Sequence, residues 1–339
     1  MFFYLGILVL TTSLVYVSET KEKFDYLYWF SFLILILILT FRNIHCANDT
    51  IFYYNYFMHP EIDVPKFEIL YDLTNKLVYY LHGNYNCLLF VNAFLSLFPV
   101  FYVINKIKIN KYIYIFIYQT LVLYIFNFAI MRQTIAMSLL LMAVYFYLTK
   151  EGSKKFIYYS FFVLLAIGFH KSAILFFPII LLDIVKFDKN KLVIVVLTTI
   201  FITLFRKNIL IFVFELVAPD KIFYIENMNF DFGIVPFVLF LSGIIIDSFC
   251  TLETNMFEYS YNLIKKINIF MLYFCTFLCW IPLTGRFNQY GYLNLMFLLG
   301  FLYNKIYEKK YKYIFILILF MFYIIMLIKN PYQVIPYFV

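Results

Sequence analysis

The chain has few charges and few residues that interrupt regular structure. Of its 339 residues, 14% are charged, and it contains nine glycines, nine prolines and two tryptophans. Apolar residues make up 65% of the chain, and the mean hydropathy is +0.87. So few charges could not cover the apolar surface of a soluble globule in water. The composition therefore excludes soluble classes and indicates a polytopic membrane protein.

Sequence motifs for cofactors and nucleic acid are also missing. The five cysteines show no paired spacing of metal ligands, and no glycine-rich phosphate loop occurs. We expect neither a cofactor nor a metal site. The formal net charge of +8 comes from lysines scattered over short loops rather than from one basic stripe, so no nucleic-acid partner is expected. A disulfide between Cys46 and Cys87, near the two ends of one loop, is left open.

The apolar runs predict helices. They are rich in Leu, Ile and Phe and lack the strict alternation of barrel strands, so helices are the way to satisfy the backbone in lipid. Because about 20 helical residues cross a bilayer core, we expect an all-α, polytopic integral membrane protein with about 12 transmembrane helices (about 10 to 13). Residues 1–339 would form a single membrane domain. The expected stretches are 1–18, 27–41, 86–104, 112–130, 133–149, 156–169, 172–185, 192–206, 233–249, 267–284, 289–304 and 313–328.

Lysines give the expected orientation. Seventeen of the 23 lysines follow odd-numbered stretches, and the positive-inside rule places that side in the cytoplasm. Both termini then lie outside, together with every arginine of the chain: Arg42, Arg132, Arg206 and Arg286. Arginines on the outer side run against the usual bias. Since a guanidinium binds phosphate through two parallel hydrogen bonds, their placement suggests a phosphorylated lipid at the outer leaflet.

Two longer segments, 42–85 and 207–232, are expected to be external loops. The first combines carboxylates with many tyrosines, including Asp49, Glu61, Asp63, Glu68, Asp72, Tyr53, Tyr54, Tyr56, Tyr71, Tyr79 and Tyr80. Aromatic faces with hydroxyl groups suit sugar rings. An interfacial aromatic belt explains the same tyrosines equally well.

Four local groups of polar residues are candidates for chemistry. Arg42 precedes Asp49, Tyr53 and Tyr54 at the exit of the second stretch. Arg132 and Gln133 stand where the fourth and fifth stretches meet with almost no loop, so the first turn of a helix there would reinforce an anion site. A snorkelling Arg42 and an Arg132 that only anchors a turn are the structural alternatives.

The other two groups also lie at tight bends. His170 and Lys171 adjoin between two apolar helices, where a polar group is costly unless it is paired. A lone histidine more often packs than reacts, yet His170 can take up a proton near neutral pH. Arg286 lies beside Gly285, with Tyr290 following. Arg206, at the start of a long loop, is the weakest of the arginine candidates and could serve only as an anchor.

The order of these groups resembles the EpsG family of bacterial membrane proteins, relatives of the Wzy polysaccharide polymerases. The likeness rests on an Arg followed by a Gly-x-Asp-like element, an Arg-Gln-x-x-Ala element, a Phe-His-Lys-Ser-Ala element and a late Arg with a nearby Tyr. Here these are Arg42 with Asp49 and Tyr53, Arg132-Gln133 with Ala136, 169–173, and Arg286 with Tyr290. Ala47 stands where the pattern has glycine.

The resemblance implies a metal-independent membrane glycosyltransferase of capsule, exopolysaccharide or O-antigen biosynthesis. Such an enzyme polymerises undecaprenyl-diphosphate-linked oligosaccharide repeat units at the external, periplasmic face of the bacterial cytoplasmic (inner) membrane. The substrate and membrane lipid are the expected partners, with a chain-length regulator and a flippase as further candidates. We expect His170 to act as the base and Asp49 to bind the acceptor, either of the two being able to remove the proton. The expected diphosphate ligands are Arg132, Lys171, Arg286 and Arg42, and the expected sugar ligands are Tyr53, Tyr54, Gln133 and Tyr290.

Other classes of membrane protein fit some of these features. A flippase for the same lipid-linked sugar also needs cations near a diphosphate, but it should show repeated halves, and no repeat is present. A glycosyltransferase that adds a single sugar, or a ligase that moves a finished glycan to another acceptor, would use nearly the same chemistry. A sugar O-acyltransferase is less favoured because it would handle a cytoplasmic thioester.

Overall fold

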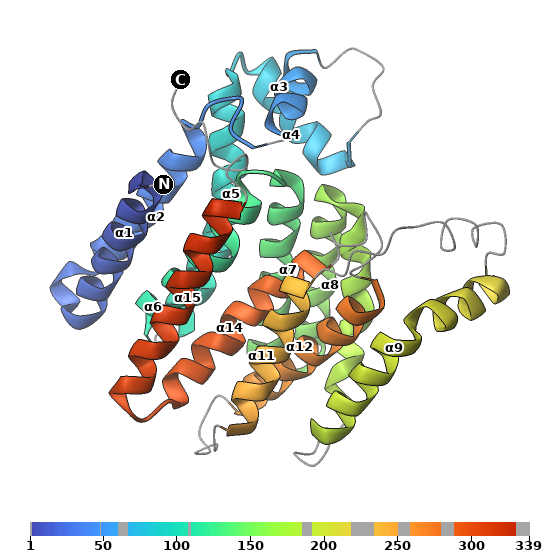
Figure 1. The fold of residues 1–339 in the computed structure, drawn as a ribbon. Coiled ribbons are helices and arrows are strands. Elements are labelled where there is room, and N and C mark those ends of the chain that lie inside the picture. Colours follow the sequence, from blue (N-terminus) through green and yellow to red (C-terminus); the bar gives the residue numbers. More distant parts are fainter. Residues whose placement is uncertain are drawn as a thin grey trace. The chain divides into compact units, whose positions relative to one another are not determined.

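The structure is a computed structural model that describes residues 2–47, 49–59, 67–107, 110–184, 192–217, 234–249, 258–278 and 288–329 (Figure 1). Throughout these residues the regular structure is helical and no strand occurs. The prediction of an all-α fold is therefore confirmed for the part of the chain that is described. The chain divides into two compact units, Met1–Phe177 with Tyr307–Val339, and Pro178–Ile306.

The first unit is a bundle built around α5. Helix α5 (Tyr85–Ile107) packs against α2 (Tyr26–Thr40) and α7 (Met131–Thr149), and α7 packs along α8 (Gly152–Phe169). Helix α1 (Phe2–Thr20) contacts α2 and α6 (Lys111–Tyr118). A wider, π-helical segment, η2 (Gln119–Asn127), continues α6 and contacts α15 (Lys309–Lys329). Large side chains such as Tyr4, Tyr28, Phe101 and Tyr118 are fully buried among these helices.

The second unit centres on α12 (Glu258–Leu278). It packs against α9 (Leu192–Val217), α11 (Ile234–Phe249) and α14 (Gly291–Lys305). The first residue of α14 must be small, because a Cβ on Gly291 would lie 2.5 Å from the ring of Phe240 in α11. A 3₁₀ segment, η3 (Lys171–Asp183), carries the chain from the first unit into the second.

Four described helices are long and apolar enough to cross a membrane: α1, α5, α7 and α15. Helix α2 is apolar but shorter. Each of the twelve predicted stretches overlaps a helical segment. The predicted count of about twelve spans is nevertheless not confirmed.

The long segment 42–85 is folded rather than open. It contains α3 (Thr50–Met58) and α4 (Ile69–Tyr80), which contact each other and α5, and α4 also contacts α8. Figure 1 shows α3 and α4 beyond one end of α5. The predicted loop 207–232 begins inside α9, which continues to Val217, and most of its remainder lies outside the described residues.

The two ends of the first unit carry different charges. Arg42 follows α2, Arg132 lies in the first turn of α7 and His170 follows α8, and all three are at the end that α3 and α4 cover. The opposite end carries lysines at the exits of α5 and α7 and at the start of α6. There Lys111 Nζ lies 3.7 Å from Asp25 Oδ1. Within this unit, Arg42 and Arg132 therefore lie at the end that α3 and α4 cover, together with Lys171, whereas Lys106, Lys111 and Lys150 lie at the other end.

Candidate active site

Glu68, the residue before α4, is the centre of a buried ion cluster in the first unit. Its backbone is extended (φ −60°, ψ 150°), so the chain turns into α4 with the carboxylate beside α7 and α8. Arg132 Nη1 donates to Glu68 Oε2, and His170 Nδ1 lies 3.1 Å from Glu68 Oε1. The Lys171 amide donates to the same oxygen over 3.3 Å. Only 10% of the Glu68 side chain is exposed, so these contacts replace most of its hydration.

These contacts determine the charge of the carboxyl group. Burial alone would raise the pKa of Glu68, but the hydrogen bond from His170, the charge of Arg132 and the Lys171 amide outweigh burial and lower the pKa to about 2. Glu68 is therefore ionised at neutral pH and can only accept hydrogen bonds. His170 Nδ1 must then carry a hydrogen. In a neutral imidazole with this tautomer, Nε2 is the ring atom that can accept a proton.

Arg132 is held by aromatic rings as well as by Glu68. Its Cζ lies 4.1 Å from the ring centre of Phe67, and 5.8 and 6.0 Å from those of Tyr53 and Tyr71. Its Nε also lies 3.5 Å from the Tyr53 hydroxyl. Aromatic faces attract a guanidinium, and the start of α7 adds the positive end of the helix dipole. This is the electrostatic setting expected of an anion site.

A close contact between α4 and α8 brings Glu68 within reach of His170. Gly168 lies in the last turn of α8, and a Cβ placed there would be 2.5 Å from Leu70 Cδ1 and 2.6 Å from Leu70 Cγ. Leu70 is two residues after Glu68, in the first turn of α4. The missing side chain at Gly168 thus lets the start of α4 lie directly on the end of α8.

Arg42 is buried beside the end of η2, and Tyr53 and Tyr71, which contact Arg132, also lie close enough to act on its charge. It is 4% exposed, its Nη1 donates to the carbonyl of Asn127 over 3.0 Å, and its Cζ lies 5.3 Å from the Phe128 ring centre. The carbonyl belongs to the end of η2, where the helix dipole is negative and favours a cation. Burial lowers the pKa of Arg42. Its Nε and Nη2 have no hydrogen-bond partner in the described structure.

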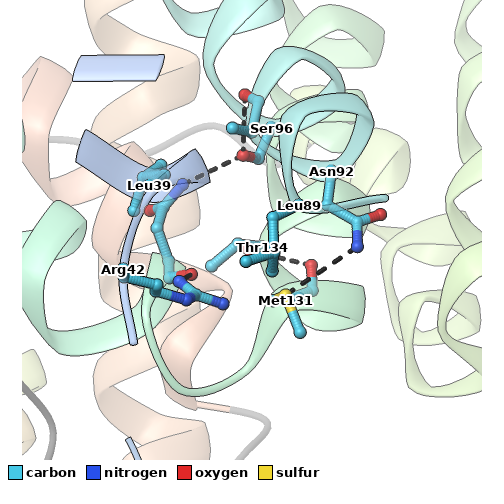
Figure 2. A pocket seen from close by; sticks show the side chains of 9 residues that line it. Leu39, Arg42, Leu89, Asn92, Ser96, Met131 and Thr134 are labelled. Carbon is cyan, nitrogen blue, oxygen red and sulfur yellow. Dashed lines mark hydrogen bonds between the residues drawn. The ribbon is translucent and has the colours of Figure 1, made fainter. Parts of the chain in front are cut away.

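Figure 2 shows the small cavity beside this guanidinium, where Asn92 of α5 and Thr134 of α7 also contribute to the wall. Its volume is about 10 Å³, which is about the room of one water molecule. A diphosphate does not fit there as the helices are now packed. Contact between Arg42 and a diphosphate would require the end of α2, α5 and α7 to separate.

Asp49 precedes α3 at a turn with unusual backbone geometry. Ala47 has φ of +73°, in the left-handed region that favours glycine. This is the position where the family pattern has glycine, so the turn keeps its shape although the residue differs. Asp49 forms no side-chain cap on α3 and no ion pair with Arg42 in the described part of the chain.

The remaining candidates are distributed over both units. Tyr53 is buried against Arg132, whereas Tyr54 is half-buried with its ring 5.2 Å from that of Tyr85. Gln133 is buried in the first turn of α7, and Lys171 is exposed next to the cluster. Tyr290 is buried at the start of α14 in the second unit. Arg286 and the Arg206 side chain lie outside the described residues.

Glu68 is the site residue that the sequence analysis missed. It was one of several carboxylates in segment 42–85, and its partners Arg132 and His170 are 64 and 102 residues away in the chain. Its position before an amphipathic pattern predicts where a helix begins. It does not predict that Glu68 pairs with a histidine. Cys46 and Cys87 are not bridged to each other, so the disulfide left open by the sequence is not formed.

Helices of spanning length, with a paired Glu-His-Arg group at one end, indicate a helical membrane protein with a polar ion cluster. A model of the EpsG family matches residues 25–339, and the chain belongs to this family of Wzy-like polysaccharide polymerase-type membrane proteins. Membership confirms the resemblance and suggests a membrane protein of polysaccharide biosynthesis. No curated protein and no solved structure matches the chain.

Proposed function

We propose that the chain is a metal-independent glycosyltransferase that polymerises polyprenyl-diphosphate-linked oligosaccharide repeat units. The observation that carries the proposal is the group of Glu68, His170 and Arg132. It unites the histidine of one family motif with the arginine of another, although the two are far apart in the sequence. The group thus offers a base and an anion-binding cation in one place, as this reaction requires.

The proposed chemistry divides between these side chains. The acceptor hydroxyl loses its proton to His170 Nε2 while its oxygen forms a bond to the anomeric carbon of the donor sugar. The bond from that carbon to the diphosphate oxygen breaks, and its electron pair leaves with the diphosphate. Glu68 holds the imidazole in the required tautomer and stabilises the imidazolium that forms, which makes Glu68 a positioning residue.

The leaving diphosphate needs cations, because negative charge grows on it in the transition state. Arg132 and Lys171 supply two positive charges beside the base, and Glu68 neutralises one of them. The group keeps a net positive charge of about one when His170 is neutral. Arg286 remains a predicted third ligand. Arg42 adjoins a cavity of only about 10 Å³. In the packed arrangement it would support the site without contacting the diphosphate.

Location and partners follow from the same proposal. With the lysine-bearing ends of the helices in the cytoplasm, the Glu68 group faces outside, where a flippase would deliver the lipid-linked repeat units. Asp49 and the tyrosines of segment 42–85 are then available to the acceptor saccharide. A chain-length regulator would act on the growing polymer at this face.

The test is the size distribution of surface glycan in cells that lack the gene. We expect single repeat units on the outer surface in place of the wild-type ladder, and a restored ladder when the wild-type chain is supplied. Repeat units trapped inside the cell would instead indicate a flippase. An unchanged ladder would exclude a required role in polymerisation.

A further inference from the structure

A second, larger hollow lies in the first unit, between the ends of α3 and α4 and the start of α5. Its volume is about 650 Å³, in the range of small-molecule sites. The walls are mainly aromatic, and amides and an imidazole stand at the rim: Tyr54, Phe57, Tyr79, Tyr80, Tyr85, His82, Asn84 and Asn86. Among the described residues, no Asp, Glu, Lys or Arg lines it. We call this hollow the tyrosine groove.

The aromatic rings of the tyrosine groove pack against each other, and part of their surface remains exposed. Tyr54 meets Tyr85 edge to face, with ring centres 5.2 Å apart, and Phe57 meets Tyr79 in the same way at 6.0 Å. Tyr80 is 65% exposed and Tyr79 is 39% exposed. The hydroxyls of Tyr54, Tyr79 and Tyr80 form no hydrogen bond among the described residues. The groove therefore combines apolar ring faces with unused hydroxyl groups, which is the surface that a sugar ring requires.

His82 occupies a position where glycine is expected. It ends α4 with φ of +56°, while the amides of His82 and Gly83 donate to the carbonyls of Tyr79 and Val78, each over 2.9 Å. This is a Schellman ending, whose left-handed residue is usually glycine. This conformation is unfavourable for a residue that has a side chain. Strained backbone of this kind is common at ligand sites, and here it holds an imidazole at the groove rim.

The tyrosine groove and the Glu68 group share the same two helices. On α3, Tyr53 contacts Arg132 and the next residue, Tyr54, lines the groove. On α4, Glu68 precedes the first residue and Tyr80 is the last, which separates them by roughly 18 Å at 1.5 Å per residue. A molecule with an anionic end at Arg132 could thus extend an uncharged part along α3 and α4 into the groove.

We propose that the tyrosine groove binds the saccharide part of the substrate, with uncharged sugar rings stacked on its tyrosines. That this saccharide is the repeat unit of a surface glycan rests on the proposed function. The affinity of the groove for an uncharged oligosaccharide does not depend on the proposed function. The groove would select the sugar, while the Glu68 group performs the transfer.

Binding can be measured on the purified full chain in detergent with an oligosaccharide obtained by partial hydrolysis of the cell's surface polysaccharide. Ligand-observed saturation-transfer NMR should detect binding to the wild-type chain. The double variant Tyr54→Ala/Tyr80→Ala should bind about tenfold or more weakly, since two stacking faces are lost. His82→Gly should weaken binding while keeping the end of α4. Tyr313→Ala, which removes a 70% exposed tyrosine of α15, is the matched control and should bind as wild type.

Lipid is the competing occupant of an aromatic surface in a membrane protein, and it needs a separate test. For this, Tyr80→Trp is placed in a chain with Trp29→Phe and Trp280→Phe and reconstituted with brominated lipid. We expect weak quenching and a change in fluorescence when the oligosaccharide is added. Strong quenching that the oligosaccharide does not alter would mean that lipid covers the groove, and would overturn the proposal.

The two proposals fail in different ways. If the wild-type chain and the double variant bind the oligosaccharide equally, or neither binds at millimolar concentration, the groove proposal is overturned whatever the glycan ladder shows. If the gene deletion leaves the ladder unchanged while binding is lost in the double variant, the groove proposal is supported and polymerisation is not.

Discussion

At the scale of single residues, Glu68 determines what His170 can do. The carboxylate fixes the hydrogen on Nδ1 and leaves Nε2 as the acceptor, and at the same time it pairs with Arg132. One side chain thus connects the proposed base to the proposed diphosphate ligand. Replacing it should therefore change both the reactivity of His170 and the stability of the first unit.

We predict that Glu68→Gln lowers polymer yield by roughly ten- to hundredfold, the size of effect seen when a group that orients a catalytic or ligating histidine is removed. Glu68→Asp should recover part of the yield because it restores a carboxylate. The pH dependence of single-turnover transfer should also shift in Glu68→Gln, since the imidazolium loses its partner. A normal yield and pH profile in Glu68→Gln would show that Glu68 does not orient the base.

The same variant tests the lowered pKa of Glu68. A carboxyl group whose pKa falls on folding stabilises the protein above its unfolded pKa of about 4.5, and this stability is lost as pH falls toward about 2. The gain is on the order of 3 kcal/mol. Wild type should therefore unfold at a higher temperature than Glu68→Gln at pH 7, and the gap should narrow as pH falls from 4.5 toward 2. An equal difference in unfolding temperature between the two chains at pH 4.5 and at pH 2 would contradict the ion cluster.

At the scale of helices, the contact of α4 with α8 positions the proposed site. Gly168 gives α4 the space to lie on α8, and Leu70 fills that space. A methyl group at Gly168 would press on Leu70 near its branch point, so the first turn of α4 would have to move. Glu68 would move with it, away from His170.

We predict that Gly168→Ala reduces polymer yield at least tenfold while the chain still inserts and folds. Adding Leu70→Ala removes the clash and should restore part of the yield, because the two changes act on one contact. The matched control is Gly6→Ala in α1, where a Cβ would meet no atom within 4 Å. Equal losses in Gly168→Ala with and without Leu70→Ala would show that this contact does not position Glu68.

The sequence predicts the helices of this chain better than it predicts their contacts. Apolar runs mark each long helix, since the helices must satisfy their backbone internally. Helices α3 and α4 were not expected, because both lie in a polar segment, and the backbone of Ala47 shows that a glycine-like turn survives the loss of the glycine. The family motifs indicated Arg132 and His170, but only folding brings Glu68 to them. The same folding buries Arg42, which the sequence analysis placed at the exit of the second stretch.

At the scale of the molecule, the placement of the described arginines and of the lysines between helices links structure to function. In the first unit Arg132 and His170 lie at the end covered by α3 and α4, and Lys111 lies at the other end with Asp25. By the positive-inside rule, we expect the lysine-bearing loops in the cytoplasm. The end with the Glu68 group should then face outward, where lipid-linked repeat units would be polymerised.

Cysteine labelling tests this orientation directly, because Cys87 is an exposed free thiol near the start of α5. In a chain whose other cysteines, Cys46, Cys250, Cys275 and Cys279, are replaced by alanine, we predict that a membrane-impermeant maleimide labels Cys87 in intact spheroplasts. The control is the same chain with Cys87→Ala and Glu151→Cys, because residue 151 is exposed between α7 and α8 at the lysine-bearing end. Its thiol should react only after permeabilisation.

The reverse labelling pattern would place the Glu68 group in the cytoplasm. Arg132 and His170 would then meet lipid-linked sugars before they cross the membrane, where single sugars are added to the carrier rather than whole repeat units joined. Polymerisation at the outer leaflet would be excluded, although the ion cluster and the tyrosine groove would keep their geometry. The side-chain chemistry by itself fits both a polymerase and a carrier-dependent glycosyltransferase. The orientation of the chain therefore separates these two proposals.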